Sequence, residues 1–464
     1  MSRSISFMSL AEKLRHLLGN DAVADDAETL MAHSGDKWFA AQAPEVVVLA
    51  RSTIDVSTLL KFASREEIPV TARGAGYGYV GGCVPVRGGV ALSLARMNRI
   101  KEIHVADAVA VVEPGVITGD LQTRVREQQL FYPPDPASLH DCSIGGNVAT
   151  NAGGPRCLKY GVTRHYIIGL EVVLANGEIL HTGGRVHKNK TGFDLIGLFV
   201  GSEGMLGVVT EITLRLLPLP RGRASLSASF TTMSESAATV QKIFAAGFLP
   251  SSLEIADHFT LEAARHDSGA AHVPAGNAHL LVDLDGQEET VHVEMSKLRD
   301  LVASRRPTAL EIATNEPDCE KLWALRREFS NSLRATGLTK LNQDIVVPRS
   351  RLVDLVAFAE SLSAKSGFPI ACFGHAGDGN IHVNIMADRY NRDAAVREKV
   401  ERALDELFAQ VLAWGGVITG EHGIGLAKKR WWPEATSDVS RELHRALKQA
   451  LDPHGILNPG KFLD

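Results

Sequence analysis

The chain has 464 residues, which is long for one domain and predicts two domains, each with its own core. A formal net charge of −5, without a dense run of lysine or arginine, argues against nucleic acid as a partner. The five cysteines are scattered and include no Cys-x-x-Cys pair, so we expect reduced thiols in a cytoplasmic protein, not a disulfide framework or iron–sulfur ligands.

The N-terminal segment predicts an amphipathic helix and not a secretory signal. Ser9 and Glu12 form a capping-box pattern at the start of the predicted helix Leu10–Leu18, and Gly19 follows its end. No later stretch approaches the ~20 apolar residues of a membrane-spanning helix. Any membrane association is therefore expected to be peripheral.

The first half of the chain predicts an α+β domain with short strands and many glycines. Asn176-Gly177, between the expected strands 170–174 and 178–181, is the strongest hairpin signal. The other expected elements are a helix over 56–66 and strands over 45–50, 68–71, 91–94 and 108–112. This region ends at the proline-rich segment 217–222.

Beyond that segment strands and helices alternate, which suggests an antiparallel sheet with helices on one face. The expected strands are 224–230, 253–256, 280–283 and 309–313, and the expected helices are 234–246, 291–304 and 319–335. The expected domains are 1–219 and 220–430, followed by a C-terminal segment, 431–464.

Two histidines in the second half indicate a metal site. His375 and His382 enclose a loop with two glycines, so a tight turn between two short strands would bring their side chains together. Glu421, in the segment Thr-Gly-Glu-His-Gly, is the expected third ligand, and His422 beside it is the expected base. Two imidazoles and one carboxylate leave a divalent ion with open positions for substrate. Each histidine alone is more often an ordinary residue, and only the combined pattern favours a site.

Glycine-rich loops in the first half predict an extended ligand that contacts the backbone. The loop after residue 70 has glycines whose spacing fits the nicotinamide fingerprint poorly, and no clear helix follows it. Its backbone N–H groups can nevertheless converge on an anion such as a pyrophosphate. Three more such loops follow, at 133–138, 143–154 and 201–207. Alone, one such loop has an equal claim to be an ordinary surface loop.

These motifs resemble those of the vanillyl-alcohol oxidase type of flavoenzymes. The chain is similar to the flavin subunit of glycolate oxidase and to D-lactate and D-2-hydroxyglutarate dehydrogenases over nearly its whole length, from Pro44 to Lys461. The motifs that carry the resemblance are Arg73-Gly-Ala-Gly, Pro134-Asp-Pro-Ala-Ser, Ser143-Ile-Gly-Gly-Asn, Gly201-Ser-Glu-Gly-Met-Leu-Gly, His375-Ala-Gly-Asp-Gly-Asn-Ile-His382, Gly420-Glu-His-Gly and Leu457-Asn-Pro-Gly-Lys461. The resemblance implies an α+β fold with a two-part FAD-binding domain and an antiparallel substrate (cap) domain that carries the metal.

The resemblance also implies the FAD-binding residues. The first loop would surround the pyrophosphate, residues 134–161 would line the ribityl and isoalloxazine groups, and Glu203 to Val208 would reach the adenosine end. The C-terminal segment, with Asn458, would return to the FAD-binding domain. Covalent relatives have a histidine in the first loop, where this chain has Tyr77, so non-covalent FAD is expected. The expected FAD contacts are Arg73, Gly74, Ala75, Gly76, Tyr77, Gly78, Pro134, Asp135, Ser138, Gly145, Gly146, Asn147, Thr150, Gly153, Gly154, Tyr160, Gly161, Glu203, Gly207, Val208 and Asn458.

Together the two signals predict a metal-assisted oxidation of a D-2-hydroxy acid such as D-lactate, glycolate or D-2-hydroxyglutarate. The ion, expected to be zinc with manganese or iron as alternatives, would lower the pKa of the substrate hydroxyl. His422 would take the proton while a hydride passes to flavin N5. By resemblance, Arg326 would bind the substrate carboxylate, Asn384 would add a polar contact, and Lys340 would bind a distal acid group.

Two alternatives stay open. One is a non-redox flavoenzyme of the same fold, like the alkylglycerone-phosphate synthases, and the other is a flavin subunit that works only within a glycolate oxidase complex. The electron acceptor is open among a quinone, a cytochrome, an electron-transfer flavoprotein and an iron–sulfur subunit. A homodimer is a further expectation.

Overall fold

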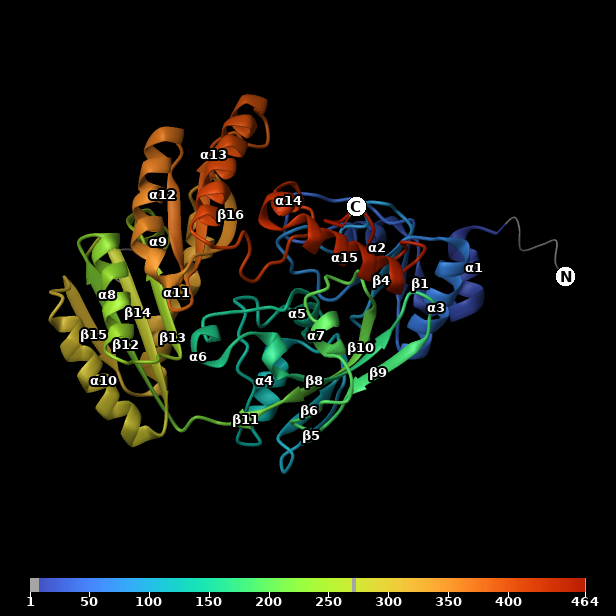
Figure 1. Ribbon diagram of the computed structural model, residues 1–464, viewed down its shortest axis with the longest axis horizontal. Helices are drawn as coiled ribbons and strands as arrows, with labels where there is room; N and C mark the ends of the chain where they lie inside the picture. The colour runs from blue at the N-terminus through green and yellow to red at the C-terminus, as the bar shows by residue number, and fades with distance from the viewer. Residues whose placement is uncertain (1–7, 269–272, 464) are drawn as a thin grey trace. The chain divides into compact units, whose positions relative to one another are not determined.

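The computed structural model describes residues 8–268 and 273–463, which form two compact units (Figure 1). The first unit comprises Met1–Ala152, Val162–Leu219 and Glu421–Asp464. The second comprises Gly153–Gly161 and Pro220–Gly420, and we call it the cap unit.

The division at Leu219 falls within the proline-rich segment that the sequence singles out. Two boundaries differ from expectation: the chain returns to the first unit at Glu421 instead of residue 431, and residues 153–161 group with the cap unit. Asp285 of the cap unit explains the second difference. Its carboxylate accepts hydrogen bonds from Lys159 Nζ at 2.5 Å and the Tyr160 hydroxyl at 2.8 Å.

The first unit contains a four-stranded sheet of order β1-β2-β4-β3, in which β4 is parallel to both β2 and β3. The valine-rich strands pack in one core with the helices beside them, as parallel strands buried on both faces require. The elements are β1 (Val23–Ala24), β2 (Val46–Leu49), β3 (Val70–Arg73), β4 (Val90–Ser93), α1 (Leu10–Leu18), η2 (Asn20–Ala22), α2 (Ala27–Ala32) and α3 (Thr53–Glu66).

A five-stranded antiparallel sheet of order β5-β6-β10-β8-β9 follows in the same unit. The predicted Asn-Gly hairpin is confirmed, because β8 and β9 pair with Val173 opposite Ile179. The elements of this part are β5 (Ile100–His104), β6 (Val109–Val112), α4 (Thr118–Arg126), β7 (Leu130–Phe131), α5 (Ile144–Thr150), η3 (Thr163–Tyr166), β8 (Ile167–Val173), β9 (Ile179–Gly183), α7 (Leu195–Phe199), β10 (Val208–Arg215) and β11 (Leu217–Pro218).

The C-terminal segment completes the first unit. Its last residues lie beside β3, where Asn458 N–H donates to the Val70 carbonyl at 2.8 Å and Leu457 forms a parallel bridge with Val70. Its helices are η6 (Lys429–Trp431), α14 (Trp432–Ala435) and α15 (Asp438–Leu451).

The cap unit is built on a seven-stranded sheet of order β15-β12-β14-β13-β17-β18-β16, and every neighbouring pair is antiparallel, as expected. Its strands are β12 (Gly222–Phe230), β13 (Ser252–Ala256), β14 (Ala278–Gly286), β15 (Ala309–Ala313), β16 (Thr339–Val346), β17 (Ile370–His375) and β18 (Asn380–Ala387). Its helices are α6 (Cys157–Tyr160), α8 (Met233–Ala245), α9 (His258–Ser268), α10 (Glu288–Ala303), α11 (Glu316–Ala335), η5 (Arg349–Arg351), α12 (Leu352–Ser366) and α13 (Ala394–Ala413).

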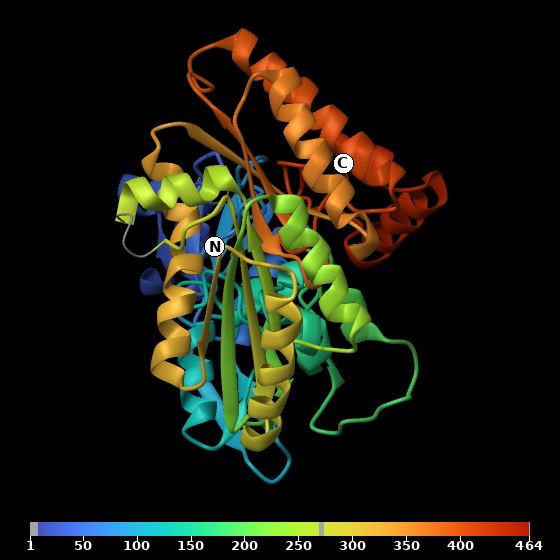
Figure 2. The same cartoon turned by 90° about the vertical axis from the view of Figure 1, so that its left-hand side faces the viewer.

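Helices accompany both faces of this sheet. In Figure 2 the strands run between the yellow α10 and the amber α11. Phe329 and Leu333 of α11 pack with α9 and with Ala256, Phe373 and other strand residues of one face. The antiparallel sheet was predicted correctly, but the expectation of helices on one face was wrong, because α9 and α11 also have apolar residues that pack on the sheet. Among the described residues, no helix is long and apolar enough to cross a bilayer.

Candidate functional site

The two predicted metal ligands lie on neighbouring strands of the cap sheet. β17 ends at His375 and β18 begins at Asn380, and His382 lies opposite Phe373 in the register. Both histidines are buried, and their ring centroids are 5.5 Å apart. The turn requires glycine at residue 379, where φ is +86° and a Cβ atom would come within 2.1 Å of the Val347 carbonyl oxygen. The predicted side-by-side placement of the histidines across a hairpin is therefore confirmed.

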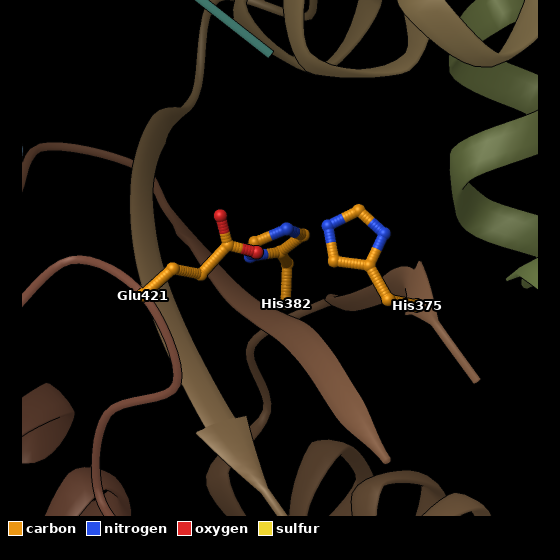
Figure 3. Close-up of side chains that lie close together, drawn as sticks. All are labelled: His375, His382 and Glu421. Carbon is orange, nitrogen blue, oxygen red and sulfur yellow. The ribbon is translucent and has the colours of Figure 1, made fainter. Parts of the chain in front are cut away.

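Glu421 lies near the histidines because the residue before it, Gly420, is hydrogen-bonded to the neighbouring strand β16. Asp344 lies opposite His382 in the β16–β18 register. The Gly420 N–H donates to the Asp344 carbonyl at 2.9 Å and to its carboxylate Oδ2 at 3.0 Å. Figure 3 shows the Glu421 carboxylate directed towards the His382 ring, with the His375 ring on the other side of it. One ligand atom from each of the three residues lies within 4.8 Å of the others.

This donor set fits a divalent ion. Two imidazole nitrogens and a carboxylate oxygen are common protein ligands of zinc in catalytic sites, which keep a further position for water or substrate. The donor atoms of one tetrahedral ion, each bound at about 2.0–2.2 Å, also lie within 4.8 Å of one another, so the separation of these three side chains is compatible with a shared ion. His375 and His382 are only 5% and 8% exposed, so few bulk water molecules can compete with the imidazole nitrogens for an ion.

A buried carboxylate that the sequence patterns did not single out contacts this set. Glu254 of β13 lies opposite His375 and is 1% exposed. Its Oε1 is 2.6 Å from His375 Nδ1, and its Oε2 accepts a hydrogen bond from Arg326 Nε, also at 2.6 Å. Burial alone would raise the pKa of this carboxyl group, but the charges and hydrogen bonds of His375 and Arg326 outweigh it and lower the pKa to about 2. The only sequence signal was one acidic residue inside the apolar strand 253–256.

The Phe373 ring lies among the predicted substrate-binding groups. The Arg326 guanidinium is 5.0 Å and the Lys340 ammonium 5.5 Å from its centroid, and the His382 ring is 5.3 Å away. Lys340 Nζ also donates to Ser330 Oγ at 2.6 Å. Burial, together with the Arg334 and Arg326 charges, lowers the pKa of Lys340 to about 7. The structure thus brings Arg326 and Lys340 to one aromatic side chain.

Asn384 lies on the same strand face as His382, opposite Asn342 of β16, and is fully buried. Its amide nitrogen donates to the carbonyls of Ala371 and His382, each at 3.0 Å. Among the described residues, its side-chain oxygen has no hydrogen-bond partner. Asn384 therefore adds a polar acceptor next to the histidine pair.

The predicted base lies in the first unit, one residue after Glu421. The His422 ring packs on Tyr79 of the first glycine loop, with centroids 5.1 Å apart. Glu203 holds the segment that follows, because its two carboxylate oxygens accept the N–H groups of Ile424 at 2.7 Å and Gly425 at 2.9 Å. Burial raises the pKa of Glu203 above its ordinary value despite these bonds. The Glu203 carboxylate, expected at the adenosine end, thus contacts protein backbone.

The predicted FAD loops of the first unit are joined by Ser143, the N-cap of α5. Its hydroxyl accepts the N–H groups of Ala75 and Gly146, each at 3.3 Å. Gly74 leaves room for this hydroxyl, since a Cβ atom there would be 2.4 Å from Ser143 Oγ. Arg73 donates to the Gly35 carbonyl and is 3.2 Å from Cys83 Sγ. The first loop and the N-terminus of α5 therefore form one backbone surface.

The remaining predicted FAD residues fall into three groups. Asn147 and Asn458 are buried and use their amide nitrogens within the first unit, Asn147 to Thr118 Oγ1 at 2.7 Å and Asn458 to the Gly82 and Glu203 carbonyls. Gly153, Gly154, Tyr160 and Gly161 belong to the cap unit. The others lie in the first unit, namely Gly76, Tyr77, Gly78, Pro134, Asp135, Ser138, Gly145, Thr150, Gly207 and Val208.

Two family models match the chain, and together they span most of it. Residues 44–183 match the FAD binding domain, and residues 219–462 match the C-terminal domain of FAD linked oxidases.

Curated relatives and solved structures agree with this match. The chain is 40% identical to the glycolate oxidase subunit GlcD of Bacillus subtilis, covering 90% of this chain and 89% of the relative. It is 34% identical to the D-lactate dehydrogenase of Anaerostipes hadrus, covering 95% and 94%. The structure of p-cresol methylhydroxylase with substrate bound superposes with a TM-score of 0.79 at 20% identity over 98% of this chain and 96% of that one, a likeness of fold. The chain belongs to the FAD-linked oxidases, oxidoreductases with the vanillyl-alcohol oxidase type of FAD-binding fold.

Proposed function

We propose that the protein is a dehydrogenase, dependent on FAD and a divalent metal, that oxidises a D-2-hydroxy acid to the 2-oxo acid. The observation that carries the proposal is the set of His375, His382 and Glu421, in which both histidines are buried and His375 is connected through Glu254 to Arg326. A metal beside an arginine suits a substrate that carries a hydroxyl next to a carboxylate. The names of the two relatives, a glycolate oxidase subunit and a D-lactate dehydrogenase, support this substrate class.

The chain's residues would divide the work as follows. The three ligands hold the ion, and the Arg326 guanidinium, oriented through its Nε, offers its two terminal nitrogens to the substrate carboxylate. When bound, the ion lowers the pKa of the substrate hydroxyl, and FAD accepts the hydride from the substrate Cα. His422 takes the hydroxyl proton as general base, so the carbon–oxygen double bond forms as both hydrogens leave. Asn384 adds a polar contact, and Lys340 binds a distal carboxylate where the substrate has one.

We assign the ion as zinc, because the set of two histidines and one glutamate is a known catalytic zinc set, with manganese and iron as the alternatives.

FAD is bound non-covalently through the first-unit loops. The five cysteines are scattered and include no Cys-x-x-Cys pair, which supports a cytoplasmic location.

The reduced cofactor must pass its electrons onward, to a quinone, a cytochrome, an electron-transfer flavoprotein or an iron–sulfur subunit. A second candidate is therefore a flavin subunit that turns over only within a larger complex. The word "subunit" in the name of the Bacillus subtilis relative favours this version. A single purified chain that reduces an artificial dye with substrate would argue for the enzyme that works alone.

The direct test is flavin reduction by a panel of D- and L-2-hydroxy acids. We expect the flavin absorbance to bleach with one or more D acids or glycolate and to stay unchanged with L acids. Absence of bleaching by every acid, in protein that contains FAD and metal, would contradict the proposal and favour a non-redox reaction.

A parallel test uses His375→Ala and His382→Ala. Each variant should lose bound metal and most of the flavin reduction yet keep FAD, because these ligands lie in the cap unit and the predicted FAD loops lie mainly in the first unit. Full metal content in both variants would show that the histidines are structural.

A further inference from the structure

Glu254 is an acidic residue at the centre of a buried apolar strand. Its neighbours along β13, Leu253 and Ile255, are 1% exposed and belong to the core, as Glu254 itself is 1% exposed. A buried carboxylate costs several kcal/mol unless charged or hydrogen-bonding partners compensate it. Each of its two oxygens has one such partner, His375 Nδ1 and Arg326 Nε, both at 2.6 Å.

We infer that Glu254 is a positioning residue that links the metal ligand His375 to the substrate-binding Arg326, so that metal binding and carboxylate binding depend on the same side chain. The inference rests on the function proposed above. It adds a residue that touches neither metal nor substrate and acts through one partner on each side.

The contact with His375 determines which nitrogen can bind a metal. An ionised carboxylate only accepts hydrogen bonds, so His375 must carry its proton on Nδ1. The lone pair then lies on Nε2, the nitrogen on the opposite side of the ring. Such a carboxylate–histidine pair holds the ring in place and makes it a stronger ligand.

The contact with Arg326 determines where its guanidinium points. Arginine has its donors in a rigid planar fork, and a bond through Nε leaves the two terminal nitrogens as a matched pair for a carboxylate. The Phe373 ring, 5.0 Å from the Arg326 guanidinium carbon, supports the group from one side. Glu254 thus sets the orientation of the fork as well as the tautomer of the histidine.

Asp283 offers a matched comparison within the same sheet. It is a buried carboxylate on β14, it accepts a hydrogen bond from Arg223 Nε at 2.8 Å, and Ser225 Oγ and Trp323 Nε1 also donate to it. It therefore has an arginine partner and a similar burial, but within the described part of the chain its side-chain partners include no histidine of the metal site. Removing its charge tests general damage to the cap unit.

The experiment compares Glu254→Gln with Asp283→Asn in the FAD-loaded protein. Zinc affinity is measured by competition with a chromophoric chelator, and KM and kcat are measured at saturating zinc. We expect Glu254→Gln to bind zinc about 10–100-fold more weakly, the usual loss for such a partner of a metal ligand. We also expect a KM for the 2-hydroxy acid that stays raised after zinc is saturated, since Arg326 loses its orientation. Asp283→Asn should keep the zinc affinity and KM of the wild-type protein, even if its melting temperature falls.

A double variant tests the link to the arginine. Arg326→Met should raise KM, and combining it with Glu254→Gln should raise KM by less than the product of the two single effects, because both changes remove one interaction. If Glu254→Gln does not fold, Glu254→Asp replaces it. Asp keeps the charge but is one methylene shorter, so it cannot reach both partners in the same way and should show the same two defects.

The outcomes separate this inference from the proposed function. Zinc binding in the wild-type protein that does not depend on His375 and His382 would overturn both. Zinc binding that depends on the histidines but is unchanged in the folded Glu254 variant, with an unchanged KM, would overturn the role of Glu254 alone. Equal losses of zinc affinity and equal rises of KM in Asp283→Asn would show that the effect is general destabilisation. That result would also overturn the role of Glu254.

Discussion

At the scale of single residues, Glu421 and His422 are neighbours in sequence but have different surroundings. The Glu421 carboxylate lies with His375 and His382, whereas the His422 ring packs on Tyr79. Both residues lie in a bend flanked by Gly420 and Gly423, and their side chains have different neighbours, so one can bind a metal while the other acts as a base. Their roles should therefore be separable by substitution.

We predict that Glu421→Gln weakens metal binding, because it removes the anionic ligand of the set. His422→Asn should keep the metal and slow flavin reduction by on the order of 10²–10⁴-fold, the range for a lost general base. Metal analysis together with stopped-flow reduction by the best substrate measures both effects. The reverse pattern, with metal lost in His422→Asn and kept in Glu421→Gln, would reverse the assigned roles.

Lys340 predicts a pH dependence that belongs to substrates with a second carboxylate. Its pKa of about 7, lowered by burial and nearby arginines, means that it is charged below that pH and loses its charge as the pH rises through it. The KM for D-2-hydroxyglutarate should therefore increase between roughly pH 6 and pH 8, a window in which most lysines stay charged. Lys340→Met should raise this KM at low pH and remove the dependence.

Glycolate is the control substrate for Lys340, because it has no second carboxylate. Its KM should not show the inflection near pH 7. The same inflection with glycolate would place Lys340 at the first carboxylate instead of a distal one.

At the scale of elements, the β17–β18 hairpin decides whether the histidine pair forms at all. Gly379 has φ of +86°, and any Cβ atom there would collide with the Val347 carbonyl oxygen. Gly337, in the turn between α11 and β16, has a similar φ of +77° but open space where a Cβ atom would lie. The two glycines thus share the backbone strain of an alanine substitution but not the collision.

We predict that Gly337→Ala costs about 1–2 kcal/mol of unfolding free energy, the usual penalty for an L-residue in the left-handed region, and leaves metal binding intact. Gly379→Ala should cost at least about 3 kcal/mol and lower metal content, because the turn must shift and separate the histidines. Chemical denaturation and metal analysis of both variants measure this difference. Equal effects would mean that the turn tolerates the collision by a harmless adjustment.

At the scale of the whole molecule, the predicted ligands of the two cofactors lie mainly in different units. The first glycine loop, with Tyr77, belongs to the first unit, and the His375–His382 pair belongs to the cap unit. By the family resemblance, Tyr77 stands where covalent relatives are expected to have their linking histidine, and the Lys37 ammonium lies 4.3 Å from its ring centroid. A hydrogen bond to Asp141 raises the pKa of the Tyr77 hydroxyl, which keeps it protonated and unreactive near neutrality.

We therefore predict that acid precipitation releases intact FAD and leaves a colourless polypeptide. The absorbance spectrum of the supernatant and the mass of the polypeptide check this. Flavin that remains with the precipitated chain would contradict non-covalent binding. The Tyr77→His variant provides a comparison, because it restores the residue type that the covalent relatives use.

The sequence by itself determined the features that depend on local chemistry. The Asn-Gly hairpin, the glycine turn between His375 and His382 and the division near Leu219 follow from backbone freedom and side-chain pattern, which act over a few residues. The family motifs placed the FAD-binding domain for the same reason, since glycine loops and their neighbours are contiguous in the chain.

Only the tertiary structure decided which distant groups meet. Glu254, Arg326 and His375 come from β13, α11 and β17, and strand register and helix packing bring them together. The same holds for Glu203, whose carboxylate accepts hydrogen bonds from the backbone of residues 424–425. It also holds for segment 153–161, which belongs to the cap unit and is hydrogen-bonded to Asp285 through Tyr160. The lowered pKa of Lys340 also needs burial and neighbouring charges, which exist only after folding. Sequence spacing carries no record of such contacts, because each partner belongs to a separate element of the chain.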